Sequence, residues 1–201
     1  MMRIRLDPPE PDEIEVTVFG PGYGEAIAIH LGDGKWVSVD SCTDPESGRP
    51  AVLTYLHGLR VDVSVAVKLI VATHWHDDHI RGLGRIFDES RSATVAISSA
   101  LGEEEFLSLA ELYDEPRVRH GSGIREFNQV KKTLEDRRLQ GARFASPKWA
   151  LADRLLYQDQ IRASCHAVQA RVFALSPSDA AYSPRVSKFT HNSRTLWKSS
   201  R

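Results

Sequence analysis

Three histidines and two aspartates lie within six residues, at positions 74–79 of this 201-residue chain. They follow residues 61–73, which are rich in valine and isoleucine and are predicted to form one buried strand. A surface loop with chance histidines, or a helix start capped by Asp78, is the alternative. Packing does not account for so many ionisable side chains at the end of an apolar strand. We therefore expect residues 74–79 to form the functional site.

The spacing within this cluster suits metal binding. His74 and His76 are two positions apart, so in an extended segment both side chains point the same way and can converge on one cation. Asp78 and His79 lie on the next turn and can face a second, neighbouring position. Imidazole and carboxylate groups bind zinc, and they also suit manganese or iron. We expect one or two zinc ions here, with manganese or iron as the alternatives.

The rest of the chain predicts strands alternating with helices. Residues 14–19, 26–31 and 36–39 are expected to form an antiparallel meander whose last strand ends at Asp40. Further strands are predicted at residues 94–97, 151–157 and 171–175, and helices at 51–59, 78–87, 102–113 and 124–139. This succession predicts an α/β or α+β fold in which helices pack outside a β-sheet.

Composition limits the partners and the compartment. Lysine plus arginine (26) and aspartate plus glutamate (27) nearly cancel, which leaves a net charge of −1 and no requirement for nucleic acid or an acidic membrane. Cys42 and Cys165 are too few for a disulfide framework and fit a reducing compartment. The longest apolar stretch is interrupted by Lys68 and is too short to cross a bilayer. We expect a cytoplasmic protein without a membrane partner.

Three regions differ in character along the sequence. Residues 1–13 are expected to be a loose leader, and residues 14–182 one domain. Residues 183–201 hold five basic residues and no acidic one, and are expected to be a poorly ordered tail. Contact of this tail with nucleic acid is the alternative interpretation.

Residues 73–83, THWHDDHIRGL, resemble the HxHxDH signature of the metallo-β-lactamase fold superfamily. The opening meander, with its glycine turn at residues 20–24 and a strand ending in Asp40, is similar to the start of that fold. The branch it most resembles is the hydrolase-like domain of bacterial DNA-uptake competence proteins. The resemblance covers residues 14–100 and, more weakly, residues 174–179.

The resemblance implies a role for each residue of the motif. His74 and His76 would bind a first metal ion, and Asp78 and His79 a second. Asp78 would also be the catalytic residue, and Asp40 would orient a ligand histidine. A metal-activated water would then attack an ester, an amide or a phosphodiester, without a serine or cysteine nucleophile.

The downstream part of the pattern departs from that superfamily. A complete site needs a third histidine, a bridging aspartate and a last histidine, for which the chain offers only weak candidates: His120, His166, His191, Asp153 and Asp179. We therefore expect a truncated member in which only the N-terminal half of the αββα sandwich is complete. Open sheet edges would then favour self-association.

These observations support two main functional hypotheses. The first is a metal-dependent hydrolase that acts on a small-molecule ester or a phosphodiester, with nucleic acid as one substrate to consider. The second is a truncated, catalytically inactive remnant that binds a metal or a partner. A redox enzyme with one iron ion is the third and less favoured interpretation. Metal identity and stoichiometry distinguish the three.

Overall fold

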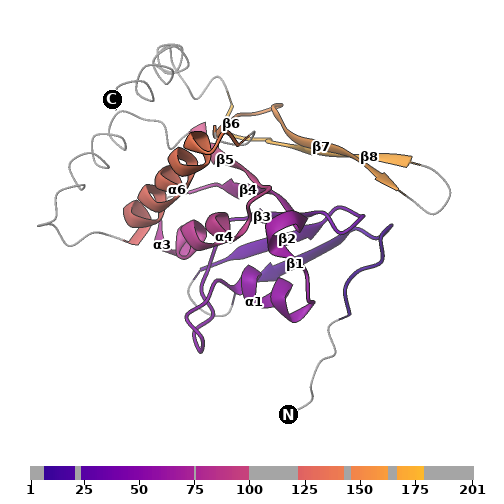
Figure 1. The fold of residues 1–201 in the computed structure, drawn as a ribbon, viewed down its shortest axis with the longest axis horizontal. Helices are drawn as coiled ribbons and strands as arrows, with labels where there is room; N and C mark the ends of the chain where they lie inside the picture. Colours follow the sequence, from indigo (N-terminus) through magenta and orange to yellow (C-terminus); the bar gives the residue numbers. More distant parts are fainter. Residues whose placement is uncertain are drawn as a thin grey trace, which may run out of the picture.

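The fold has three layers: helices, a six-stranded sheet, and a two-stranded hairpin on the opposite face of that sheet (Figure 1). The computed structural model describes residues 7–20, 24–74, 76–99, 122–142, 146–162 and 167–178. Helices and strands both contribute to this part of the chain, so the expected mixed α/β class is confirmed.

The large sheet begins antiparallel and ends parallel. Its strands are β1 (Glu15–Phe19), β2 (Ala26–His30), β3 (Trp36–Val39), β4 (Val67–Ala72), β5 (Thr94–Ser98) and β6 (Lys148–Ala150). They lie in this same order across the sheet. The first three form the expected antiparallel meander. The pairs β3–β4, β4–β5 and β5–β6 are parallel, so their carboxyl ends lie at one edge.

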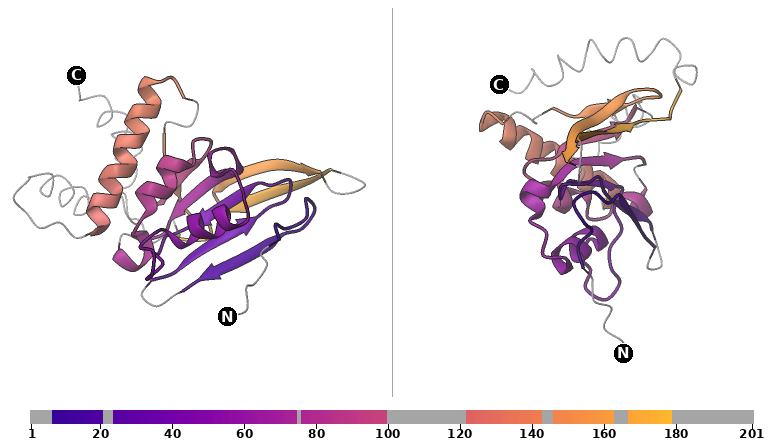
Figure 2. Two further views of the ribbon diagram at one scale, coloured as in Figure 1. Left: turned by 60° about the horizontal axis from the view of Figure 1, so that its bottom comes forward. Right: turned by 90° about the vertical axis from the view of Figure 1, so that its right-hand side faces the viewer.

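The other two layers cover opposite faces of this sheet, as the second view of Figure 2 shows. The helices are α1 (Ala51–Gly58), α2 (Val63–Ala66), α3 (Asp77–Ile80), α4 (Leu83–Glu89) and α6 (Ser122–Leu139). The hairpin consists of β7 (Leu155–Arg162) and β8 (Ala167–Phe173), which pair antiparallel.

Two apolar clusters hold the layers together. Trp36 of β3 faces the helices and belongs to the same buried cluster as Leu53 and Phe87. The next residue, Val37, faces the hairpin and shares the second cluster with Ile161 of β7. Successive strand residues point to opposite faces, so a strand between two covered faces is buried on both sides. This explains why all five residues of β5 are buried.

The edge strand β1 is covered less completely. The hairpin-side face of this strand carries Val16 and Val18, which are 59% and 68% exposed, and the preceding Ile14 is 75% exposed. Their cross-strand neighbours on β2, Ile29 and Ile27, continue the same apolar face toward the buried cluster. Among the described residues, β1 is thus an edge strand with an exposed apolar face, while open edges toward a missing half and self-association stay predictions.

Residues 61–73 do not form the single strand that their composition predicted. They begin with the short helix α2, and β4 starts only at Val67. The Asp62 side chain accepts hydrogen bonds from the backbone N–H of Ser64 at 3.1 Å and from its hydroxyl at 2.7 Å. Such an N-cap satisfies a backbone N–H in the first turn of the helix. The valine-rich sequence alone does not reveal this helix.

Residues 78–87 were predicted to form one helix, and this too is wrong. The structure has two short helices, α3 and α4, separated by Arg81 and Gly82. Gly82 has φ +88°, in the left-handed region, and a Cβ there would lie 2.8 Å from the Pro50 ring. The chain therefore turns sharply after the histidine cluster, at a position that only glycine fits.

The later elements were predicted less accurately. The helix expected at 124–139 is confirmed as α6, but the strands expected at 151–157 and 171–175 are displaced relative to β7 and β8. The short strand β6 was missed. The helix expected at 102–113 lies outside the described residues. Within the part that the structure describes, no helix is long and apolar enough to cross a membrane.

Helix α6 is tied to both short helices by polar contacts at their ends. The Asp77 carboxylate in α3 accepts a hydrogen bond from the backbone N–H of Gly123 at 2.9 Å. In the other direction, the Glu126 carboxylate accepts from the N–H of Gly84 in α4 at 2.9 Å. Each carboxylate satisfies a donor in the first turn of the neighbouring helix. These contacts hold the histidine-bearing turn against a helix of 18 residues.

Candidate metal centre

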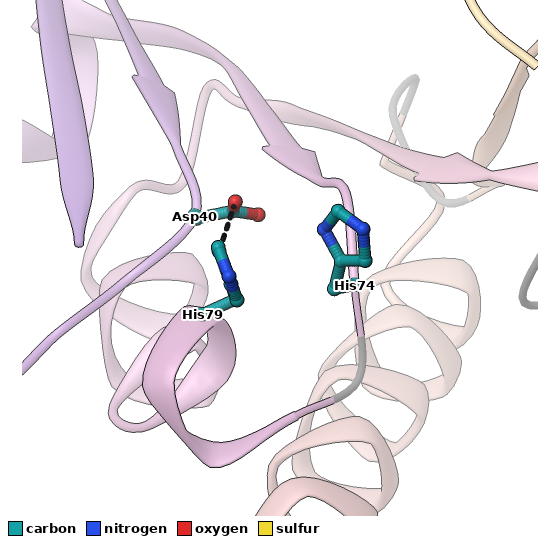
Figure 3. A group of neighbouring side chains, drawn as sticks. All are labelled: Asp40, His74 and His79. Atoms are coloured by element: carbon teal, nitrogen blue, oxygen red, sulfur yellow. Dashed lines mark hydrogen bonds and ion pairs between the residues drawn. The ribbon is translucent and has the colours of Figure 1, made fainter. Parts of the chain in front are cut away.

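The site lies where the parallel strands β3 and β4 end. Val39 of β3 pairs with Val71 of β4, so Asp40 and Thr73 follow their strands at neighbouring positions. The Asp40 N–H donates to the Val71 carbonyl at 2.8 Å, which continues the pairing by one residue. His79 approaches from α3 and His74 from the loop after β4, as Figure 3 shows. Strand pairing thus brings together residues more than thirty positions apart.

Asp40, His74 and His79 form a compact group of potential ligands. Each offers one nitrogen or oxygen atom, and these atoms all lie within 4.8 Å of one another. The rings of His74 and His79 have centroids 4.8 Å apart. Asp40 is buried, His79 is half-buried and His74 is exposed, so the group opens to solvent on the His74 side.

Asp40 is held by hydrogen bonds that also orient both histidines. It accepts from the Thr73 N–H at 2.7 Å, from the Thr73 hydroxyl and from Nδ1 of His79 at 3.0 Å. Because the Thr73 hydroxyl donates to Asp40, its oxygen accepts from Nδ1 of His74, at 2.8 Å. Both imidazoles therefore carry their proton on Nδ1 and leave Nε2 as the free donor for a metal ion.

The surroundings of Asp40 keep its carboxylate in place. Burial raises the pKa of this carboxyl above its ordinary value, and the hydrogen bonds from Thr73 and His79 oppose that rise. Its backbone has φ +55°, in the left-handed region that aspartate tolerates better than most residues. A non-glycine residue in this conformation is common at functional sites. Asp40 thus contacts His79, and its role in orienting a metal ligand stays a prediction.

The other two motif residues lie beside this group. The Asp78 carboxylate is 3.8 Å from Nε2 of His79, on the side that His79 turns away from Asp40. The His76 ring is stacked at 18° to the His74 ring, with centroids 6.4 Å apart. The expected pair of Asp78 and His79 is therefore close together, and His74 lies nearer to His79 than to His76.

The candidates for the missing ligands do not join the group in the described part of the chain. Asp153 lies in the turn between β6 and β7, where its N–H donates to the Ala174 carbonyl at 2.8 Å. Its φ of +63° suits that turn, and its carboxylate is not among the gathered ligand atoms. The other four, His120, His166, His191 and Asp179, lie outside the described residues.

Two residues near the site were missed from the sequence. Thr73 precedes the motif directly, and its hydroxyl links His74 to Asp40. Glu25 follows the glycine turn, and its carboxylate lies 3.7 Å from Nδ1 of His79. A threonine at the strand end was the only available signal for the first, and nothing local distinguished Glu25 from other exposed acids.

The donor set fits a divalent metal ion chemically. Two imidazole Nε2 atoms with a nearby carboxylate are ligands typical of zinc, and they also accept manganese or iron. Hydrogen bonding of the other ring nitrogen to a carboxylate or a hydroxyl is the usual support for a ligand histidine. Comparison with known proteins adds no family: no protein-family model matches the chain, and no curated protein sequence matches it.

Proposed function

We propose that this protein is a metal-dependent hydrolase of the metallo-β-lactamase fold that acts on an ester or a phosphodiester. The observation that carries the proposal is the gathering of Asp40, His74 and His79 ligand atoms within 4.8 Å at the ends of β3 and β4. The arrangement of hydrogen bonds supports the proposed chemistry, and the order of the layers supports the proposed fold.

The fold part of the proposal is supported by the order of the layers. A sheet that begins as an antiparallel meander and becomes parallel carries helices on one face. The β7–β8 hairpin on the other face takes the place in which a second sheet of an αββα sandwich would begin. The resemblance of residues 73–83 to the HxHxDH signature points to the same fold.

Each residue of the site would have a different role. Nε2 of His74 and Nε2 of His79 would hold the ion. Asp40 would fix the His79 ring directly through Nδ1, and the His74 ring through the Thr73 hydroxyl. When bound, a divalent ion supplies Lewis acidity and lowers the pKa of a coordinated water. The Asp78 carboxylate is about one-third exposed and lies 3.8 Å from Nε2 of His79. It is therefore placed to take up a proton beside that nitrogen.

Metal content of the purified chain tests this proposal. The expected result is about one or two zinc ions per chain by mass spectrometry, lost in His79→Ala. His57→Ala is the matched control, because His57 lies on α1 and contacts Arg49 and Glu89 instead of the site. Hydrolysis of p-nitrophenyl acetate and of bis(p-nitrophenyl) phosphate should follow the metal content. A wild-type chain without metal, or a metal content equally lost in His57→Ala, would refute the proposal.

A second candidate function is a catalytically inactive, metal- or partner-binding remnant. It is favoured by the state of Asp40, whose carboxylate already accepts three hydrogen bonds and so offers little to an ion. Within the described residues this leaves two histidines and Asp78 as the strongest ligands. One weakly held ion, with neither ester nor phosphodiester cleaved, would select this function over the hydrolase.

A further inference from the structure

Gly24 lies directly against the backbone of α3, the helix that carries Asp78 and His79. A Cβ on Gly24 would lie 2.5 Å from the Asp78 carbonyl oxygen, 3.2 Å from the Asp78 carbonyl carbon and 3.0 Å from Cβ of Cys42. Carbon atoms do not approach a backbone carbonyl this closely without displacement. The residue also has φ +102°, which side-chain-bearing residues rarely adopt.

A hydrogen bond fixes this close approach. The N–H of Glu25 donates to the same Asp78 carbonyl at 2.9 Å. A second bond follows one residue later, from the Ser41 N–H to the His79 carbonyl at 2.8 Å. Helix α3 has only four residues, so its own hydrogen bonds determine its position poorly. External contacts of this kind must therefore set where Asp78 and His79 lie.

The other glycines with positive φ in the described chain differ in their surroundings. Gly34, Gly48 and Gly141 would place a Cβ in open space, with nothing within 4 Å. Gly32 and Gly82 would meet the side chains of Ile161 and Pro50 first. Gly24 is the one whose nearest neighbour is the main chain of a residue in the metal centre.

We propose that Gly24 is a positioning residue of the metal centre, because its missing side chain allows the Glu25 N–H to hold the backbone of α3. The inference rests on the proposed function, since it concerns the same ligands. Adding a methyl group at Gly24 requires a displacement of about 0.5–1 Å to restore ordinary contact distances. Loss of the contacts that support a metal ligand typically costs about 10- to 100-fold in metal affinity, and we expect a loss of this order here.

The test compares Gly24→Ala with Gly34→Ala in the full-length chain. Both substitutions put alanine at a positive φ, so both introduce backbone strain, but only the first meets a neighbour. Zinc affinity is measured by competition with a chelating dye, and cobalt(II) absorption reports the ligand geometry. We expect Gly24→Ala to bind zinc about 10- to 100-fold more weakly and to change the cobalt spectrum. Gly34→Ala should match the wild type in both measurements.

The outcomes separate the two proposals. A wild-type chain that binds neither zinc nor cobalt refutes the proposed function itself. Binding by the wild type with unchanged zinc affinity and cobalt spectrum in Gly24→Ala overturns this inference alone. A Gly24→Ala chain that fails to fold, beside a folded Gly34→Ala, also overturns it, because the contact would then serve the fold and not the site.

Discussion

Replacing Arg137 by methionine should destabilise the fold more than any other single charge removal on α6. Arg137 is only 8% exposed, and its guanidinium donates to the carbonyls of Phe87, Ser90 and Ala93 at 2.6, 2.9 and 2.9 Å. It also lies 3.9 Å from the centre of the Phe87 ring. One side chain thus satisfies carbonyls at the end of α4 and in the segment that leads into β5.

The magnitude follows from the groups that methionine would leave behind. The Ser90 carbonyl keeps a second partner, the N–H of Ala93 at 3.0 Å, so the loss falls mainly on the carbonyls of Phe87 and Ala93. Two buried carbonyls without partners cost about 2–6 kcal/mol, and the lost cation–π contact about 1 kcal/mol more. Burial of the methionine offsets part of this. We expect a net loss of about 3–5 kcal/mol in the free energy of unfolding.

Thermal unfolding followed by circular dichroism measures this loss. For a chain of this length the expected decrease of the midpoint is about 6–20 °C. Arg125→Met is the matched control, because Arg125 is exposed on the same helix. Arg137→Lys keeps the charge but not the three-way geometry, so its midpoint should lie between the two. Equal midpoints for Arg137→Met and Arg125→Met would refute the reasoning.

Three further predictions concern other parts of the structure. His30 is buried, accepts from the Gly34 N–H at Nε2 (3.1 Å), and burial lowers its pKa below the ordinary 6.5. Because the unfolded chain then binds the proton more readily, stability should fall as pH drops below about 6.5, and His30→Gln should reduce that loss in urea titrations. Gly32→Ala should cost about 1–3 kcal/mol more than Gly34→Ala in urea unfolding, because its Cβ meets Ile161. Asp40→Asn should weaken zinc binding about 10- to 100-fold in dye competition while leaving the circular dichroism spectrum unchanged.

The opening meander and α6 were predictable because their patterns are local. The residues of β2 alternate between buried and half-buried, and the Gly32–Gly34 turn joins them to β3. In α6, Val130 and Leu134 recur at helical spacing and are buried. No distant residue is needed to interpret either pattern.

The start of residues 61–73 was not predictable in the same way. Valine and alanine at positions 63–66 suit a strand or a short helix, and β-branched residues favour the strand. The hydrogen bonds from Ser64 to Asp62 stabilise the helix over the strand. The Ser92 hydroxyl then donates to the Val65 and Val67 carbonyls at 3.0 Å each, a contact across 25 or more positions. The Asp62 cap and the distant Ser92 hydroxyl therefore outweigh the local preference of these residues for a strand.

The site shows the same division between local and distant information. His74 and His79 stand out in the sequence because histidines and aspartates are concentrated at positions 74–79. A metal ligand also needs a defined ring orientation. That orientation comes from Asp40 and the Thr73 hydroxyl, which meet only because β3 and β4 pair with Val39 opposite Val71. A shift of this register by one residue would turn Asp40 to the other face of the sheet. The histidines would keep their spacing and lose their support, so the proposed metal centre depends on strand register as much as on its candidate ligands.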